Sequence, residues 1–213
     1  MQNAIFWIFN FLVITCRLPI QKSVKFDMGK KSRLVNCDAH SIHGRYNIIC
    51  VGDKSKLSGC RFVFKGNNNV IRIGKNCQLS KTTFWISGNG NCIEIGNKTT
   101  VGNNCQFATL EGTNIKIGED CMFSHDIYVR TSDSHSILDK DNNRINQSQS
   151  ISIGNHVWVG LQALILKGSE ISDNSVVAAR AIVSKKFNEE GCLLVGAPAK
   201  IIKEEINWSR EKL

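Results

Sequence analysis

The stretches Ile93-Glu-Ile95-Gly96-Asn-Lys-Thr-Thr-Val101 and Ile115-Lys-Ile117-Gly118-Glu-Asp-Cys-Met-Phe123 repeat one pattern at a distance of 22 residues. In each, an alternating aliphatic pair runs into Gly, and an apolar residue returns six positions after the second aliphatic residue. Equivalent rows open at Val51-Gly52 and Ile73-Gly74. A short, fixed period is the signature of a solenoid, in which each row forms one coil that stacks on the next.

The spacing of six inside each row indicates three faces per coil. Beyond residue 150 it continues without interruption through Ile153, Val159, Ile165, Ile171, Val177 and Val183. Short strands separated by sharp corners build a triangular prism with parallel strands between adjacent coils, and Gly66-Asn-Asn-Asn69 and Gly88-Asn-Gly-Asn91 supply residues that tolerate positive φ. We therefore expect an all-β parallel β-helix. In two rows the expected inward residues are Ile73, Leu79, Trp85, and Ile95, Val101, Phe107.

One coil carries an insertion. The step from Val129 to Ile151 is 22 residues, whereas the equivalent step from Val63 to Ile71 is 8, a difference of 22 − 8 = 14 residues. We place this inserted loop at about residues 133–150. The motif Thr131-Ser-Asp-Ser-His135 spans its start. Loops on a rigid scaffold commonly carry function, so the insertion is the first place to look for a site.

Composition narrows the classes of partner. The 213 residues have a formal net charge of +9, which suits an anionic ligand or surface, but no nucleic-acid-binding module is recognisable and we expect no nucleic-acid partner. The nine cysteines include no C-x-x-C pair. Cys77, Cys105 and Cys121 each follow a repeat aliphatic residue by four positions, which predicts small core fillers rather than disulfides. Reduced thiols fit a cytoplasmic protein.

Both ends of the chain differ from the repeat. Residues 4–15 are apolar except for Asn10, too few to span a bilayer, and we expect a helix. It would pack on the solenoid end or a neighbouring subunit, or lie in a membrane interface with the basic residues that follow on anionic headgroups. We expect three regions: this helix and a basic connector over 1–33, the β-helix over 34–202, and a capping helix over 203–213.

Several motifs resemble a known family. Ile153-Gly-Asn-His-Val-Trp-Val-Gly160, Ile165-Leu-Lys-Gly168 and Val195-Gly-Ala-Pro-Ala-Lys-Ile201 are similar to the hexapeptide repeats of left-handed β-helix acyltransferases. Arg130-Thr-Ser-Asp-Ser-His135, followed by Trp158, resembles most the bacterial capsular polysaccharide O-acetyltransferases, including those that act on polysialic acid. The resemblance implies a left-handed coil, acetyl-CoA as co-substrate and a homotrimer with active sites between subunits. An apolar face bearing Phe and Trp is itself a reason to associate.

The implied reaction needs few groups. A thioester is already activated, so a base that takes the proton of an attacking hydroxyl is sufficient, and histidine suits that role. Of the five histidines, His135 matches the catalytic position of the family, and Asp133 is a candidate to orient its ring. The resemblance places Trp158 in the active site, although subunit packing would also explain an aromatic residue there. We expect His125 and His156 to be surface groups.

The resemblance also implies where the substrates bind. The family places Gly160, Ala178 and Ala179 along the pantetheine arm, and candidate ligands for the coenzyme phosphates are Arg180, Lys185, Lys186 and Lys200. The family commonly has Gly-Ala-Gly-Ser where this chain has Ala178-Ala-Arg-Ala181, so Arg180 is a phosphate ligand or a solvated corner. Ser134 and the rest of the polar insertion suit a sugar acceptor, and Arg144 suits an acceptor carboxylate.

Four other functions are compatible with this fold class. A carbonic anhydrase of this fold needs three converging histidines with a pair five residues apart, whereas His125 and His135 are ten apart, so we expect no metal. Acyl-carrier-protein-dependent acyltransferases generally have a longer helical C-terminal domain. A non-catalytic glycan-binding solenoid and a small-sugar or xenobiotic O-acetyltransferase remain. The apolar N-terminal segment favours an acceptor that is a cell-surface polysaccharide or its sugar precursor.

Overall fold

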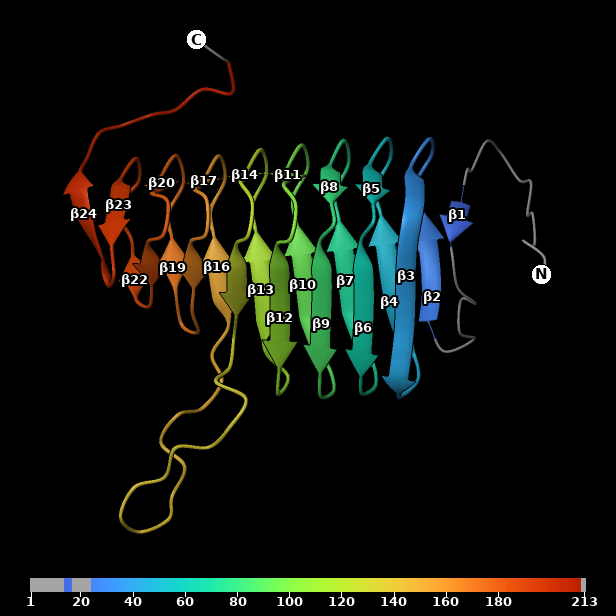
Figure 1. Ribbon diagram of the computed structural model, residues 1–213, viewed down its shortest axis with the longest axis horizontal. Helices are drawn as coiled ribbons and strands as arrows, with labels where there is room; N and C mark the ends of the chain where they lie inside the picture. The colour runs from blue at the N-terminus through green and yellow to red at the C-terminus, as the bar shows by residue number, and fades with distance from the viewer. Residues whose placement is uncertain (1–13, 17–23, 212–213) are drawn as a thin grey trace.

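The chain folds into a parallel β-solenoid with three faces (Figure 1). The computed structural model describes residues 14–16 and 24–211, and these contain strands, corners and loops but no helix. Accordingly, no helix in the described part of the chain is long and apolar enough to span a membrane. The predicted all-β parallel solenoid is confirmed. The left-handed sense of its coils stays a prediction.

Successive coils visit the faces in the order 1, 2, 3. Face 1 is an 8-stranded sheet of β2 (Val24–Met28), β4 (Asn47–Val51), β7 (Val70–Ile73), β10 (Cys92–Ile95), β13 (Asn114–Ile117), β16 (Ile151–Ile153), β19 (Glu170–Ile171) and β22 (Lys186–Phe187). Face 2 contains β5 (Lys56–Ser58), β8 (Gln78–Ser80), β11 (Thr100–Val101), β14 (Met122–Phe123), β17 (Trp158–Val159), β20 (Val176–Val177), β23 (Leu193–Gly196) and β24 (Ala199–Lys203). Face 3 contains β6 (Arg61–Lys65), β9 (Thr83–Ser87), β12 (Gln106–Leu110), β15 (Tyr128–Arg130), β18 (Leu164–Ile165) and β21 (Ile182–Val183).

The first coil begins earlier than residue 34. Strand β2 pairs with β4, and the long strand β3 (Arg33–His43) pairs first with β5 and then with β6, so it joins faces 2 and 3 into one sheet. Strand β1 (Ile14–Cys16) pairs with β3. The segment expected to connect a helix to the solenoid therefore contributes strands of its own. The predicted N-terminal helix lies outside the described residues apart from Ile14–Cys16, which form β1.

The repeat sets the register of the strands. Ile71 pairs with Ile93, Ile93 with Ile115, and Ile115 with Ile151, so the coil that carries the insertion returns to the same position as its neighbours. At the corners, Asn69 Nδ2 donates to Asn47 Oδ1 at 3.1 Å, and Asn91 Nδ2 donates to Asn69 Oδ1 at 2.9 Å. These buried asparagines hold the corner between faces 3 and 1 in the same shape from coil to coil.

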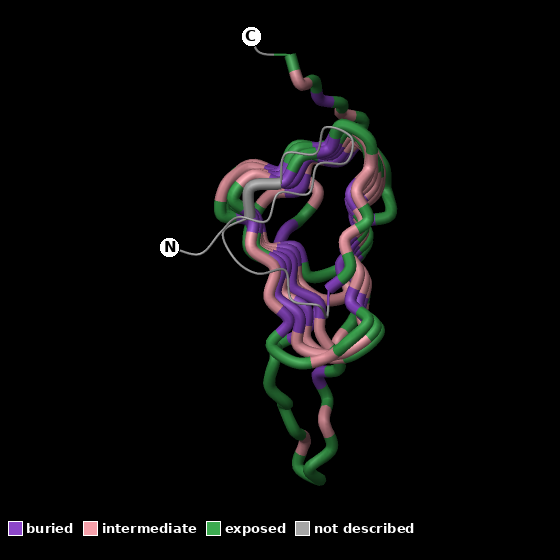
Figure 2. Tube along the Cα trace, turned by 90° about the vertical axis from the view of Figure 1, so that its right-hand side faces the viewer, coloured by how far each residue is buried: buried purple, intermediate pink, exposed green. Residues whose placement is uncertain are grey.

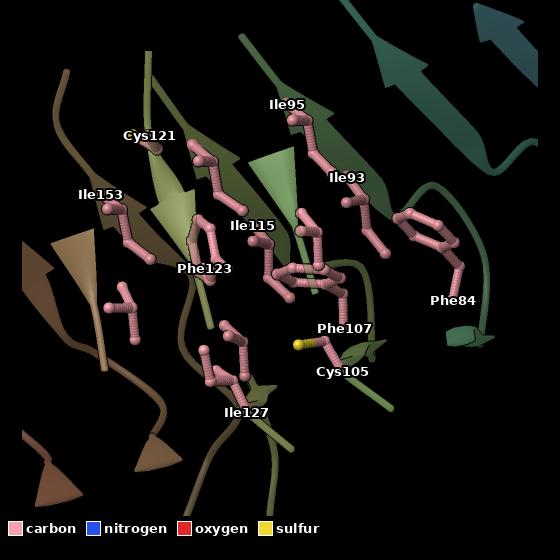
Figure 3. Close-up of a cluster of buried hydrophobic side chains, with 14 of the residues drawn as sticks. Phe84, Ile93, Ile95, Cys105, Phe107, Ile115, Cys121, Phe123, Ile127 and Ile153 are labelled. Carbon is pink, nitrogen blue, oxygen red and sulfur yellow. The ribbon is translucent and has the colours of Figure 1, made fainter. Parts of the chain in front are cut away.

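The core is a stack of equivalent side chains from successive coils (Figure 3). Phe62, Phe84 and Phe107 form a ladder with ring centroids 5.1 and 5.6 Å apart, and all three rings are fully buried. The expectation that Trp85 points inward is wrong. Leu79 and Phe84 are five residues apart, whereas Val101 and Phe107 are six apart, so Phe84 takes the inner position.

The predicted role of three cysteines as core fillers is confirmed. Cys77, Cys105 and Cys121 are all buried at corners of the coils, and the described cysteines are free thiols. Burial raises the pKa of both Cys105 and Cys121 to about 11. Thiols with so high a pKa are protonated at neutral pH and are poor nucleophiles.

The predicted C-terminal helix is wrong. Strand β24 turns back on β23 as an antiparallel pair, and residues 204–211 continue as an irregular, extended tail. The tail places Trp208 in a buried contact with a corner of the solenoid instead of over its open end. Tertiary contacts of this kind override the weak local pattern of spaced apolar residues that suggested a helix.

Replacing the inner ring should destabilise the protein more than replacing its outer neighbour. We expect Phe84→Ala to lower the free energy of unfolding by about 3–5 kcal/mol, because it opens a cavity between two stacked rings. Trp85→Ala is the matched control, since the outward indole contacts Lys65 Nζ at 4.6 Å and fills no core position. Urea denaturation of both variants checks this, and an equal loss would contradict the assigned register.

Candidate active site

The insertion projects from the edge where face 3 meets face 1. Figures 1 and 2 show it as a long arm on the opposite side of the prism from the C-terminal tail. The arm is itself a hairpin: Leu138 and Arg144 form an antiparallel bridge, and Ile145 N donates to Ile137 O at 2.9 Å. These backbone hydrogen bonds between its two sides give the arm a defined structure.

Asn146 holds the base of the arm together. Its side chain is buried, and Nδ2 donates both to Asp133 Oδ2 at 2.7 Å and to the backbone carbonyl of His135 at 2.8 Å. Its Oδ1 accepts from the backbone N–H of Ile137 at 2.7 Å. One amide therefore fixes the backbone on both sides of His135. The imidazole of His135 is exposed and makes no hydrogen bond to any described residue, so it is available to a substrate.

The carboxylate of Asp133 forms its hydrogen bonds with residues other than His135. Its carboxylate is paired with Lys167 Nζ and with Asn146 Nδ2, and these hydrogen bonds lower the pKa of Asp133. The residue predicted to orient the histidine ring is instead part of the base of the arm. Folding lowers the pKa of Asp133, so its ionised carboxylate stabilises the folded protein at neutral pH. This stabilisation is lost as the pH falls through the lowered pKa.

Arg144 and Ser134, the two residues of the insertion predicted to bind the acceptor sugar, form hydrogen bonds within the protein. Arg144 Nη1 donates to Glu111 Oε1 at 3.0 Å, and hydrogen bonds from Arg144 and Ser148 lower the pKa of Glu111. Ser134 Oγ accepts from Arg130 Nη2 at 2.6 Å. The guanidinium of Arg144 thus anchors the arm to the end of β12 and does not present a free fork to a sugar carboxylate.

A groove of about 620 Å³ runs along the outer surface of face 2. Trp158 lies at one end, in β17, and is 38% exposed. The groove is lined by Lys56, Ser58, Gln78, Leu79, Ser80, Thr100, Val101, Gly102, Met122, Phe123, Ser124, His125 and Trp158. Its walls thus combine hydroxyl, amide and aromatic groups over five adjacent strands, β5, β8, β11, β14 and β17. This mixture suits a polar ligand with apolar faces, such as a sugar.

The predicted pantetheine residues are neighbours at the edge between faces 2 and 3. A Cβ atom added to Gly160 would lie only 2.6 Å from the backbone nitrogen of Ala179, and 2.9 Å from the carbonyl carbon of Ala178. Glycine at this position therefore allows the two coils to stack closely. The side chains of Leu161 and Arg180 are exposed beside this close contact, so the edge offers both apolar and cationic surface.

The predicted phosphate ligands are more dispersed. Arg180 lies at this same edge and its Nε donates to Gln162 Oε1 at 2.9 Å. Lys186 pairs with Glu170 on face 1, and Lys185 Nζ lies 5.0 Å from the ring of Phe187. Lys200 is exposed on β24. Of these four, Arg180 is the one that the structure places beside Ala178 and Ala179.

His135 and Trp158 do not meet within one chain. His135 belongs to the arm at the edge of faces 3 and 1, whereas Trp158 belongs to β17 on face 2. Asn146, Lys167 and Glu111 were not predicted from the sequence, because their roles depend on contacts across the two ends of the insertion. His156 was expected to be a surface group, whereas its ring is stacked on Trp208. In the described part of the chain, no group of three or more His, Cys, Asp or Glu side chains could hold a metal ion.

Comparison with known proteins identifies the family. The polysialic acid O-acetyltransferase of Neisseria meningitidis is 34% identical over 179 residues, which are 84% of this chain and 82% of that protein. The chain belongs to the polysialic acid O-acetyltransferase family. It is thus a member of a family of acyltransferases. No family model matches the chain.

Other members of the polysialic acid O-acetyltransferase family agree with this. The protein from Escherichia coli O1:K1 / APEC is 40% identical over 98 residues, which cover 46% of this chain but only 32% of the length of that relative. The crystal structure of the polySia-specific acetyltransferase NeuO superposes with a TM-score of 0.75 at 32% identity and covers 90% of this chain and 91% of that one. The polysialic acid O-acetyltransferase OatWY gives 0.69 at 30% identity, covering 89% and 92%.

Removing the side-chain amide of Asn146 should loosen the arm without unfolding the solenoid. We expect Asn146→Ala to raise amide hydrogen exchange at Ile137 and Ile145 by about tenfold or more, because the variant leaves Asp133 and the His135 carbonyl without a buried partner. Lys140→Ala, at the exposed end of the arm, is the control. Exchange mass spectrometry measures both, and an unchanged arm in Asn146→Ala would show that Asn146 does not hold it.

Proposed function

We propose that the chain is an acetyl-CoA-dependent O-acetyltransferase that acetylates a hydroxyl of a cell-surface polysaccharide or its sugar precursor. Family membership supports acyl transfer, and one observation about the site carries the mechanism: the backbone of His135 is held by Asn146 while its imidazole is exposed and unpaired among the described residues. A general base needs this combination of a fixed position and a free nitrogen.

The reaction proceeds by direct attack. His135 accepts the proton of the acceptor hydroxyl as the oxygen forms a bond to the thioester carbonyl carbon, and the carbonyl oxygen becomes an oxyanion. The indole N–H of Trp158 is the proposed donor to that oxyanion. Collapse breaks the carbon–sulfur bond, and the coenzyme thiolate takes the proton from His135. No acyl-enzyme is needed, and Cys121, with its pKa raised by burial to about 11, is no candidate nucleophile.

The coenzyme is proposed to lie along the edge between faces 2 and 3. Gly160 packs closely on Ala179 there, the small side chain of Ala179 is exposed, and Arg180 is the nearest predicted cation for the phosphates. Backbone amides and carbonyls suit the amide groups of a pantetheine arm. Because Arg180 already donates to Gln162, its planar guanidinium is held in place with further donors available.

The acceptor is proposed to lie along the groove on face 2. Five strands line it, and parallel strands are spaced by about 4.8 Å, so the groove extends for roughly 19 Å from Trp158 to Lys56. This length suits several sugar residues in a row better than a single sugar or a compact xenobiotic. Lys56, at the far end, supplies a cation for an acidic sugar.

The site is proposed to form between copies of a homotrimer. His135 lies in the arm at the edge of faces 3 and 1, whereas Trp158 lies on face 2, so the proposed mechanism needs a neighbouring copy to bring them together. The arm has an apolar surface for this contact: Ile137, Leu138 and Ile145 are 55%, 50% and 62% exposed. Aliphatic side chains this exposed to water on a hydrogen-bonded hairpin are expected to be covered by another subunit.

Removing the proposed base should abolish most turnover. We expect His135→Ala to lower kcat by roughly 10²- to 10⁴-fold while coenzyme binding is unchanged, because the coenzyme edge is untouched. Release of free thiol from acetyl-CoA, measured with polysialic acid, a neutral polysaccharide and a simple galactoside, tests both activity and acceptor class. His43→Ala is the matched control. Wild-type turnover in His135→Ala would refute the assignment.

A mixed assembly should regain activity if the site is shared. When His135→Ala and Trp158→Ala chains are refolded together, about a quarter of the sites in a random mixture combine intact His135 with intact Trp158 from another chain. Each variant alone should retain only a small residual turnover. Light scattering gives the number of chains. Absence of any recovery, with mixing demonstrated by two different tags, would mean that both residues act from one chain.

A further inference from the structure

The C-terminal tail is bound to the solenoid beside Trp158. After β24 it crosses the edge between faces 1 and 2, and Figure 1 shows it on the side opposite the arm. Ile206 N donates to Gly191 O at 2.8 Å, which directs the chain towards this edge. Trp208 is 8% exposed, although the segment around it is irregular. A buried indole in such a segment indicates a specific docking site.

Trp208 and His156 hold each other reciprocally. Their rings are stacked, with centroids 4.3 Å apart and planes at 11°. Trp208 Nε1 donates to the His156 carbonyl at 2.7 Å, and His156 Nε2 lies 3.0 Å from the Trp208 carbonyl. His156 Nδ1 lies 2.7 Å from Asp120 Oδ2. Both ring nitrogens of His156 therefore lie within hydrogen-bond distance of an oxygen atom, one of Asp120 and one of the tail.

Arg210 anchors the end of the tail. Its Nε donates to Asp120 Oδ1 at 2.9 Å, and Nη1 donates to Thr100 Oγ1 at 3.0 Å. Nη2 donates to the carbonyls of Cys121 at 2.8 Å, Asp120 at 3.1 Å and Lys98 at 3.3 Å. Burial raises the pKa of Asp120, but hydrogen bonds from His156 and Arg210 outweigh it and leave that pKa below its ordinary value. Asp120 is therefore the shared anion of the cluster.

The docked tail adjoins the proposed acceptor groove. His156 is two residues before Trp158, and the rings of Trp208 and Trp158 lie 6.1 Å apart at 46°. Thr100, which accepts from Arg210, also lines the groove. Within face 2, Trp158 pairs with Met122 and Val176 of the adjacent strands, and the ring of Trp208 adds a contact from the tail.

We propose that Trp208 and Arg210 are positioning residues, which dock on His156 and Asp120 and thereby hold the indole of Trp158 at the end of the groove. This proposal rests on the function proposed above. The tail acts through Trp158 and touches no reacting atom. Its loss should therefore lower kcat more than it weakens coenzyme binding.

A double-mutant cycle tests the coupling. We expect Trp208→Ala to lower kcat by about tenfold and Trp208→Phe by less, because Phe retains the stack and loses the N–H. Trp208→Ala added to Trp158→Ala should cause no further loss. Ser209→Ala, within the same tail, is the control and should behave as wild type. Losses that multiply in the double variant, or a lowered melting temperature with unchanged kcat, would overturn the proposal.

A second measurement does not depend on catalysis. With 5-fluorotryptophan in place of tryptophan, the fluorine resonance of Trp158 is identified by its loss in Trp158→Phe. Arg210→Ala, which keeps every indole, should shift or broaden that resonance, whereas Ser209→Ala should not. An unchanged Trp158 resonance would refute the positioning role. If the wild-type protein shows this behaviour but transfers no acetyl group, the proposed function fails while the docking of the tail stands.

Discussion

Backbone pairing between successive coils is the constraint on which the rest of the structure depends. Each strand forms its hydrogen bonds with the equivalent strand one coil away, so Ile71, Ile93, Ile115 and Ile151 must stay in register for all three faces at once. A residue chosen at one position therefore decides which side chain lies above it and below it. The phenylalanine ladder, the asparagine corners and the buried cysteines are all consequences of this rule.

The same rule explains how the protein accommodates a long insertion. Strands β13 and β16 pair directly although the arm separates them in sequence, because only the two ends of the arm must meet the register. Asn146, Asp133 and Lys167 close those ends, and Glu111 ties the arm to the preceding coil through Arg144. The result is a rigid scaffold with one projecting element. The insertion therefore leaves the strand pairing of the solenoid intact.

Most of the fold could be predicted from the sequence, because in a solenoid each contact is made with a residue at a fixed separation. The rows, the corners and the place of the insertion follow from that period. Trp85 was misplaced because a step of five replaced a step of six, which periodicity alone does not reveal. The tail was misread for a different reason: Arg210 contacts Asp120 and Thr100, at separations of 90 and 110 residues that no local pattern encodes. For the site, the residues named from the sequence stay predictions, and the ion pairs of Asp133 with Lys167 and of Arg144 with Glu111 could not be predicted, because each joins residues far apart in the chain.

The groove on face 2 owes its length to the number of coils that precede the insertion. Because each coil contacts only its neighbours, duplicating one 22-residue unit before Ile117 would extend the groove by one strand spacing, about 4.8 Å, and leave the arm and the tail in their present surroundings. Gene duplication within such a protein would therefore lengthen the groove without changing the contacts of the arm or the tail. In a modular architecture of this kind, the reach of recognition and the reactive centre can evolve separately.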